Sequence, residues 1–221
     1  MLNELPKILI NLTVNKNKLI RNFMATDISK ILNHLYEFYD FTNRIIITVG
    51  AGGGQIINYG HKSKNVLAID YDKEALDKLK ENLVKSGLEN KFTLIHADFT
   101  LCHLQGDIVM FEFCLHEMED PEISLKHALT MAPDIIVVDH WTGSEWSFIG
   151  NEEEKIIKGW ETLKLFKLKK FQIFTTVQFF HDYEDLYQKV KPQGPTSIER
   201  IRDYIGKTNF TIPMSYAIAL I

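Results

Sequence analysis

Residues 44–139 alternate short apolar runs with stretches of helical periodicity. The first run, RIIITV at 44–49, is apolar at nearly every position, which is typical of a strand covered on both faces in a parallel sheet. Segments of helical spacing lie at 73–86 and 121–132. Four further runs are expected to be strands, at 65–70, 92–98, 107–113 and 135–139. This order predicts an α/β fold with a doubly wound, mostly parallel sheet.

The two ends of the chain extend this pattern. Residues 27–40 carry apolar side chains at helical spacing and predict an N-terminal helical addition. Aromatic and β-branched residues at 171–180 and 212–221 predict two more strands, which can pair at the sheet edge and make seven in total. Helices are expected around them, at about 151–165, 183–190 and 197–206.

Charge and composition disfavour several functional classes. The 221 residues include 25 Lys and Arg against 29 Asp and Glu, a formal net charge of −4, whereas proteins that bind phosphate backbones are usually basic. Cys102 and Cys114 match no zinc or redox spacing and suit a reducing compartment. The chain shows neither a signal-peptide pattern nor a run of about 18 apolar residues. We therefore expect a cytoplasmic protein without a membrane segment. Binding to nucleic acid is the weaker expectation, and no metal site is predicted.

Glycines at positions 50, 52, 53 and 54 follow the first strand and are expected to open a helix. Glycine permits a sharp turn and lets a ligand approach the backbone amides. The dinucleotide pattern G-x-G-x-x-G is absent because position 55 is Gln, and no phosphate loop of nucleotide triphosphatases is present. The spacing through Gly50, Gly52 and Gly54 is G-x-G-x-G.

Four segments in order resemble the class I S-adenosylmethionine (SAM)-dependent methyltransferases. They are VGAGGG at 49–54, AIDYD at 68–72, HADF at 96–99 and the stretch from Asp107 to Asp139. The resemblance implies a Rossmann-like methyltransferase fold and SAM as the cofactor. It implies cofactor contacts from Gly50, Ala51, Gly52, Gly54, Asp70, Tyr71, Asp98, Phe99, Glu112 and Phe113. It also divides a single domain of residues 1–221 into a helical cap at 1–42, a SAM-binding half at 43–140 and a substrate-side half at 141–221.

The implied roles follow the chemistry of the cofactor. Asp70 would accept both ribose hydroxyls, since one carboxylate can accept from two donors. Tyr71 and Phe99 would flank the adenine ring, and Asp98 would accept its amino group. Glu112 would face the methyl-donor end, beside Phe113.

One position departs from the family pattern. The first motif of these enzymes usually begins with an acid two residues before the first glycine, and that position is Thr48. Two alternatives follow: the geometry or affinity of cofactor binding differs from that of the family, or another acid compensates, with Glu112 as the candidate.

Methyl transfer requires a positioned nucleophile and sometimes removal of its proton. His116 and His140 are the candidate general bases, because imidazole titrates near neutral pH; Glu112 is the third candidate catalytic group. Two other readings are a nucleophilic Cys114 and a soft metal or metalloid bound by Cys114, His116 and His140.

The sequence therefore predicts a SAM-dependent methyltransferase acting on a small molecule. One alternative is a SAM-binding protein without catalysis, for which Thr48 is the motivating feature. The other is an RNA methyltransferase that uses lysines at 155, 158, 164, 167, 169 and 170. The stretch FEFC after the fourth strand disfavours enzymes that methylate the amino groups of bases or of glutamine.

Overall fold

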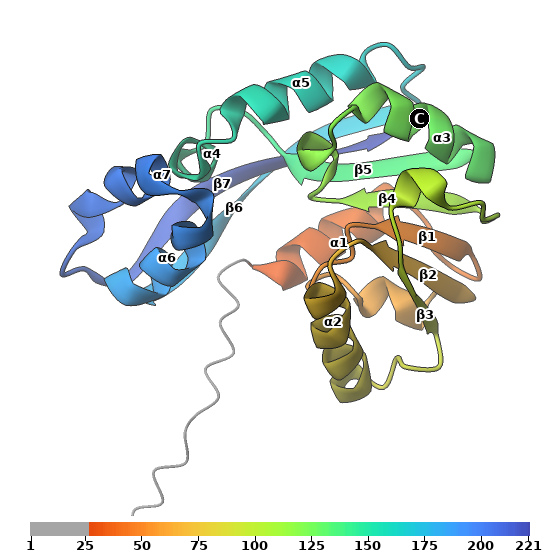
Figure 1. Cartoon of the computed structure of the whole chain (residues 1–221), viewed down its shortest axis with the longest axis horizontal. Coiled ribbons are helices and arrows are strands. Elements are labelled where there is room, and N and C mark those ends of the chain that lie inside the picture. The colour runs from red at the N-terminus through yellow and green to blue at the C-terminus, as the bar shows by residue number, and fades with distance from the viewer. Residues whose placement is uncertain (1–26) are drawn as a thin grey trace, which may run out of the picture.

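The computed structural model describes residues 27–221, which form a seven-stranded sheet with helices on both faces (Figure 1). The strand order is β3-β2-β1-β4-β5-β7-β6, and β1 to β5 are parallel. β7 lies antiparallel to both of its neighbours. The strands are β1 (Ile45–Val49), β2 (Asn65–Asp70), β3 (Phe92–His96), β4 (Ile108–Glu112), β5 (Asp134–His140), β6 (Lys170–Asp182) and β7 (Thr208–Leu220). The predicted doubly wound, mostly parallel fold is confirmed.

Successive side chains of the central strands enter two different cores. Ile46 packs with apolar residues of α1 (Ile28–Phe38) and α2 (Lys73–Ser86) on one face. Ile47 packs with those of α3 (Pro121–Met131) and α5 (Glu153–Leu163) on the other. Burial on both faces explains why the central strands are apolar throughout.

The helix ends match the sequence signals. Asp72 caps α2 by accepting from the amides of Glu74 and Ala75, and Gly87 ends it in the left-handed conformation at φ 64°. Asp120 caps α3, and Pro121 occupies its first turn, where its missing amide hydrogen is not needed. Among residues 27–221 no helix is both long and apolar enough to cross a membrane.

The expectation that the glycine loop opens a helix is wrong. Residues 50–57 form turns, and only the short 3-10 helix η1 (Asn58–His61) follows before β2. Gly50, Gly52 and Gly54 all have positive φ, a conformation that cannot continue into a right-handed helix. Three of the residues after Ala51 are glycines, the poorest helix formers after proline.

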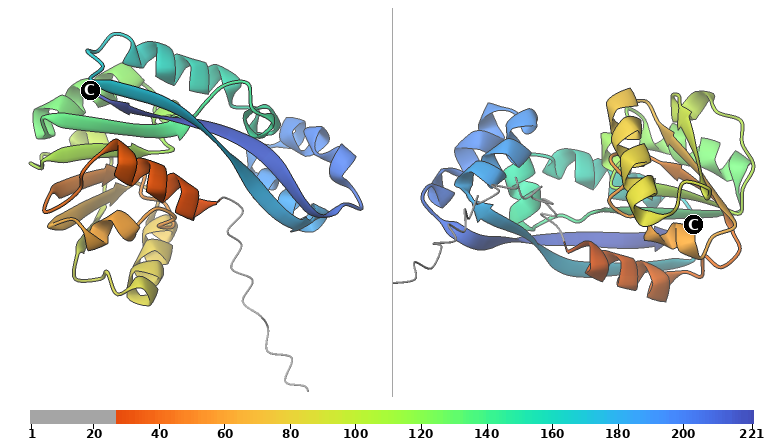
Figure 2. Two further views of the ribbon diagram at one scale, coloured as in Figure 1. Left: turned by 180° about the vertical axis from the view of Figure 1, so that it is seen from behind. Right: turned by 90° about the horizontal axis from the view of Figure 1, so that it is seen from below.

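The last two strands form a long hairpin that extends beyond the rest of the sheet (Figure 2). β7 pairs with β5 only from Tyr216 to Leu220, but with β6 along nearly its whole length. Its residues before Tyr216 therefore project past the carboxyl end of β5. Three helices pack on this projection: α4 (Glu145–Gly150), which the sequence analysis did not anticipate, α6 (Tyr183–Val190) and α7 (Pro195–Arg200). We call the projecting hairpin and these helices the hairpin lobe.

The N-terminal helix α1 belongs to the main core. Ile31 and Leu35 are fully buried and join the same cluster as the sheet residues Ile46 and Ile218. Residues 1–26 of the expected cap lie outside the described residues, and the division of the chain at residues 42 and 140 stays a prediction.

We expect Leu35→Ala to lower the free energy of unfolding by about 2–5 kcal/mol, because it removes a buried side chain and leaves a cavity. Urea denaturation would measure this, with Leu129→Ala as the control, since Leu129 of α3 is 45% exposed. Equal stability of the two variants would contradict the placement of α1 in the core.

Candidate active site

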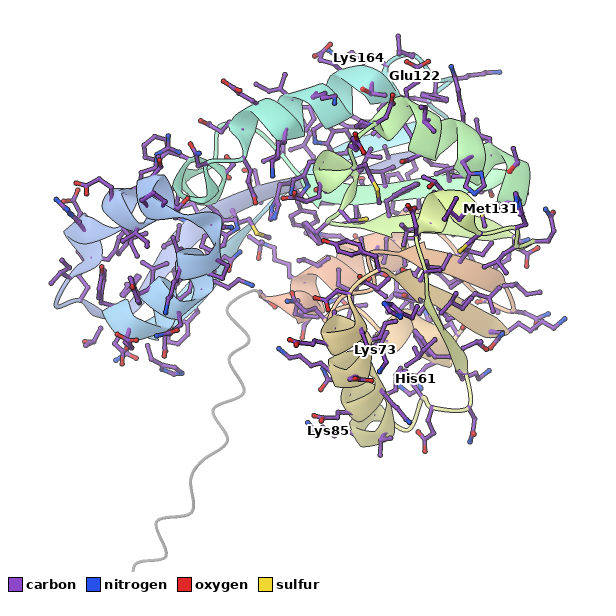
Figure 3. All side chains as sticks on the ribbon, viewed as in Figure 1. His61, Lys73, Lys85, Glu122, Met131 and Lys164 are labelled. Carbon is purple, nitrogen blue, oxygen red and sulfur yellow. The ribbon has the colours of Figure 1, made fainter. Side chains whose placement is uncertain are left out.

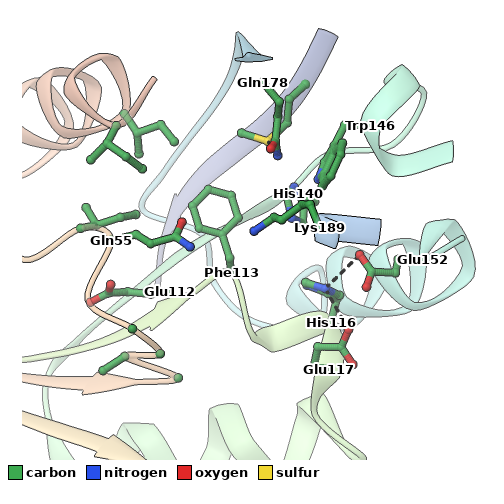
Figure 4. A pocket seen from close by; sticks show the side chains of 18 of the residues that line it. Gln55, Glu112, Phe113, His116, Glu117, His140, Trp146, Glu152, Gln178 and Lys189 are labelled. Atoms are coloured by element: carbon green, nitrogen blue, oxygen red, sulfur yellow. Dashed lines mark hydrogen bonds and ion pairs between the residues drawn. The ribbon is translucent and has the colours of Figure 1, made fainter. Parts of the chain in front are cut away.

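A cavity of about 300 Å³ lies beyond the carboxyl ends of β1, β4 and β5, beneath the hairpin lobe (Figure 4). The glycine loop forms one end of it, and two histidines with two glutamates form the other. Of the predicted site residues it brings together Gly50, Ala51, Gly52, Glu112, Phe113, His116 and His140. The other lining residues are Ile28, Ile31, Gly53, Gln55, Ile56, Glu117, Trp146, Glu152, Gln178, Lys189, Gln193 and Met214.

The glycine loop has its shape because β4 lies close behind it. A Cβ at Gly50, where φ is 67°, would come within 2.5 Å of the Cβ of Cys114. The Cys114 thiol donates to the carbonyl of Val49 at 3.1 Å, and burial raises its pKa. Cys114 therefore supports the loop, and its protonated thiol is poorly suited to be a nucleophile.

Asp70 connects the loop to the end of β2. Its Oδ2 accepts from the amide of Gly52 and its Oδ1 from the amide of Asp72, both at 2.9 Å. A carboxylate has about four acceptor positions, so each oxygen can still accept one more donor. These two bonds hold the carboxylate at the loop, in an orientation that suits a ribose diol.

Asp70 does not line the cavity, and the remaining predicted adenosine contacts also lie outside it. Tyr71 is 82% exposed beside Asp70. Asp98 is exposed after β3 and accepts from the amide and hydroxyl of Thr100. Phe99 is buried in the core against Phe111, which favours a packing role for its ring. Gly54, the last glycine of the motif, is buried and packs against α2.

Thr48 and Glu112 meet on adjacent strands. The Thr48 hydroxyl donates to Glu112 Oε1, and the hydroxyl of Tyr59 in η1 donates to the same oxygen at 2.5 Å. Burial raises the pKa of Glu112 to about 7, although these two hydrogen bonds act in the opposite direction. Thr48, at the position where the first motif usually has an acid, thus bonds to an acid on β4.

Phe113 directly follows β4, and its side chain lines the cavity. Its φ is 52°, in the left-handed region that side chains other than glycine rarely adopt and that concentrates at functional sites. Its ring lies 4.9 Å from the ring of His140 and 6.1 Å from that of Tyr216 (centroid distances). The ring separates Glu112 from the histidine end of the cavity (Figure 4).

His116 is held by Asp139. Its Nδ1 lies 2.6 Å from Asp139 Oδ1, its backbone amide donates to Oδ2 at 3.0 Å, and its Nε2 lies 3.4 Å from Glu117 Oε1. Burial lowers the pKa of His116, but the bonds to Asp139 and Glu117 outweigh it and raise the pKa to about 10. With both nitrogens occupied and a proton already held, His116 is poorly placed to accept another.

His140 has the opposite environment. Burial lowers its pKa to about 4, which the charge of Asp139 only partly offsets. Its Nδ1 is buried and has no hydrogen-bond partner among the described residues. Of the two histidines, the neutral His140 is the one that can accept a proton from a bound molecule.

Several lining residues had no sequence signal. Glu152 precedes α5, and Gln178 and Lys189 belong to β6 and α6, all outside the motif region. Tyr59, which bonds to Glu112 but does not line the cavity, also belongs to no motif. Only tertiary packing brings Glu152, Gln178 and Lys189 to the cavity.

Comparison with known proteins relates part of the chain to methyltransferases. Residues 47–132 match the family described as "Methyltransferase domain". The "Ribosomal RNA small subunit methyltransferase A" of Mycoplasma mobile is 35% identical over 85 residues, which are 38% of this chain. The chain spans only 31% of the length of that relative.

Solved structures share the fold across most of the chain. A SAM-dependent methyltransferase from Aquifex aeolicus has a TM-score of 0.53 at 18% identity, covering 89% of each chain. Magnesium protoporphyrin IX methyltransferase from Synechocystis, with bound S-adenosylhomocysteine, has a TM-score of 0.54 at 11% identity, covering 87% of this chain and 80% of that one. Residues 47–132 therefore match a methyltransferase domain in sequence, and most of the chain shares the fold of these solved methyltransferases.

Proposed function

We propose that the protein transfers a methyl group from SAM to a small molecule bound beneath the hairpin lobe. This proposal rests on one observation, a continuous cavity from the glycine loop to His140. Its volume of about 300 Å³ suits a small ligand. Helices α1, α4 and α6 contribute to its walls.

The residues present fit the cofactor. Gly50 and Gly52 leave the backbone bare at the loop, Asp70 has free acceptor positions for two hydroxyls, and Glu112 offers a carboxyl group for the amino group of the methionine part. When bound, SAM supplies an electrophilic methyl group carried on a sulfonium. This chain's residues then have to orient the acceptor and exclude water.

Lys189 suggests the charge of the acceptor. It reaches into the cavity from α6 (Figure 4) and has no ion-pair partner among the described residues. Desolvation of its ammonium lowers its pKa, as does the nearby Lys78, while Glu152 has the opposite effect. An acceptor with an anionic group would pair with Lys189 and stay within reach of His140.

The alternative without catalysis depended on Thr48. Glu112 supplies an acid against that position, so the substitution does not remove the carboxyl group from the site. This favours a functional methyltransferase over a SAM-binding protein alone.

The RNA alternative has one supporting observation, the similarity to the ribosomal RNA methyltransferase. The lysines proposed to contact RNA argue against it, because most of them already bind protein oxygens. Lys155 and Lys158 donate to Glu117 and to the Glu119 carbonyl, Lys164 to Glu161, and Lys169 and Lys170 to Asp134 and the Phe38 carbonyl. Salt-sensitive RNA binding in a gel-shift assay would favour the alternative.

Asp70→Ala is expected to weaken SAM binding by at least about tenfold while leaving the fold intact, since a lost charged hydrogen-bond acceptor costs roughly 1.5–3 kcal/mol. Calorimetry with SAM, S-adenosylhomocysteine and NAD as the negative control measures this. Asp77→Ala, an exposed aspartate of α2, should bind as the wild type does. An unchanged affinity in Asp70→Ala would refute the ribose assignment.

Glu112→Gln should remove a pH dependence of stability. The pKa of Glu112 rises from 4.5 to about 7 on folding, so its stabilising contribution is complete below about pH 4.5 and is lost as the pH rises through 7. The loss amounts to roughly 3 kcal/mol. Tyr59 and Cys114, the titratable groups beside it, keep their protons over this range because burial raises their pKa values.

Urea denaturation at about pH 5 and about pH 8 tests this linkage. Wild type should lose stability relative to Glu112→Gln between these values. Glu81→Gln, which changes an exposed residue of α2, should track the wild type. A constant difference between wild type and Glu112→Gln would show that Glu112 does not titrate in this range.

His140→Ala should reduce turnover by about 10²–10⁴-fold, the usual contribution of a general base, with little change in SAM affinity. A screen of metabolite pools with methyl-labelled SAM identifies the acceptor and provides the assay. His181→Ala is the control, since His181 is exposed on β6. Full turnover in His140→Ala would eliminate the proposed base, and His116→Ala tests whether His116 contributes at all.

A further inference from the structure

Three potential metal-ligating side chains converge at the histidine end of the cavity. One ligand atom each from His116, Glu117 and Glu152 lies within 4.8 Å of the other two. The His116 Nε2 is 3.4 Å from Glu117 Oε1 and 3.8 Å from Glu152 Oε2 (Figure 4). His116 and Glu117 belong to η3 (Leu115–Glu117), whereas Glu152 caps α5. Residues distant in sequence thus present one nitrogen and two oxygens to a common point.

Asp139 gives His116 the orientation of a metal ligand. An aspartate carboxylate is an acceptor, so it favours the tautomer with hydrogen on Nδ1, and that nitrogen is 2.6 Å from Asp139 Oδ1. A cation that displaces the proton of Nε2 would then find the lone pair of that nitrogen directed at the two glutamates. Metal-binding histidines commonly have their second nitrogen bonded to a carboxylate in this way.

Three carboxyl groups meet two cationic side chains, His116 and Lys155, at this cluster. Glu117, Glu152 and Asp139 all carry carboxyl groups around His116, which is itself buried. Lys155 pairs with Glu117 Oε2 at 2.9 Å and leaves Oε1 directed toward His116. Two salt links therefore fix Glu117 without filling the point between the three ligand atoms.

An unsatisfied polar atom lies next to this cluster. The His140 ring is 5.5 Å from the His116 ring (centroid distance). Its buried Nδ1 has no partner among the described residues, and both histidines line the same cavity. A bound species at this end of the cavity would give that nitrogen a partner.

We propose that His116 Nε2, Glu117 and Glu152 bind a divalent transition-metal ion. Three protein ligands leave coordination positions open toward the cavity, and these would take an oxygen donor of the methyl acceptor. This second part rests on the proposed function, whereas metal binding itself does not. The sequence analysis predicted no metal, because the alternative set with Cys114 was the only one that the motifs suggested. The structure turns the Cys114 thiol toward Val49.

The three ligand atoms limit which metal ions can bind here. One imidazole and two carboxylates suit Mn²⁺, Fe²⁺, Co²⁺ or Zn²⁺, and the absence of a thiolate disfavours Cu⁺. Mn²⁺ is the best probe, because free and bound Mn²⁺ are distinguished by electron paramagnetic resonance.

The test is a Mn²⁺ titration of the chelator-treated full chain without SAM, followed by competition with Zn²⁺. We expect one saturable site in the wild type and affinity reduced by about 10–100-fold or more in Glu152→Gln and in His116→Ala. Glu161→Gln, which changes an exposed residue of the same helix α5, should bind as the wild type does. Thermal melting checks that each variant is folded, and the near-isosteric Glu152→Gln keeps the test valid if His116→Ala does not fold.

The outcomes separate the two proposals. No saturable site in the wild type, or equal binding by wild type and Glu152→Gln, overturns the metal site. SAM calorimetry on the same metal-free samples reports on the proposed function independently. SAM binding without Mn²⁺ binding would reject the metal and leave the methyltransferase proposal standing.

Discussion

β7 lies between β5 and β6 and runs antiparallel to both. Because it enters the sheet from the far side, its first half has to pass beyond the carboxyl ends of the parallel strands. β6 accompanies it: α4 packs on β7, α6 packs on β6, and α7 packs against both helices (Figure 3 draws the side chains of the whole molecule). The cavity exists because this lobe lies opposite the glycine loop.

Hydrogen bonding at the loop end joins Thr48 to a buried acid. The buried carboxyl of Glu112 has two hydroxyl donors, Thr48 and Tyr59, so it is not left unsatisfied in the core. A threonine on β1 is thus bonded to an acid on the adjacent strand β4, a distance that neighbouring strands bridge readily.

At the other end of the cavity, the two histidines His116 and His140 have different surroundings. Asp139 accepts from His116 and also from the backbone amide of His140. His116 thereby gains a carboxylate partner, whereas the His140 ring is desolvated without one. Two histidines whose ring centroids are 5.5 Å apart have pKa values shifted in opposite directions, which suits them to different roles.

The fold and the loop half of the site follow from local signals in the sequence. Unbroken apolar runs such as 44–49 specify buried parallel strands, caps such as Asp72 and Asp120 set the helix starts, and the end of each strand places Asp70 and Glu112 at one sheet edge. The helix expected after Gly54 does not form, because Gly50, Gly52 and Gly54 have positive φ values, which a right-handed helix does not allow. Tertiary structure alone decided that Thr48 meets Glu112 and that Glu152 and Lys189 reach His116 and His140. These are contacts between residues far apart in sequence, and no local periodicity or propensity encodes the packing that brings them together.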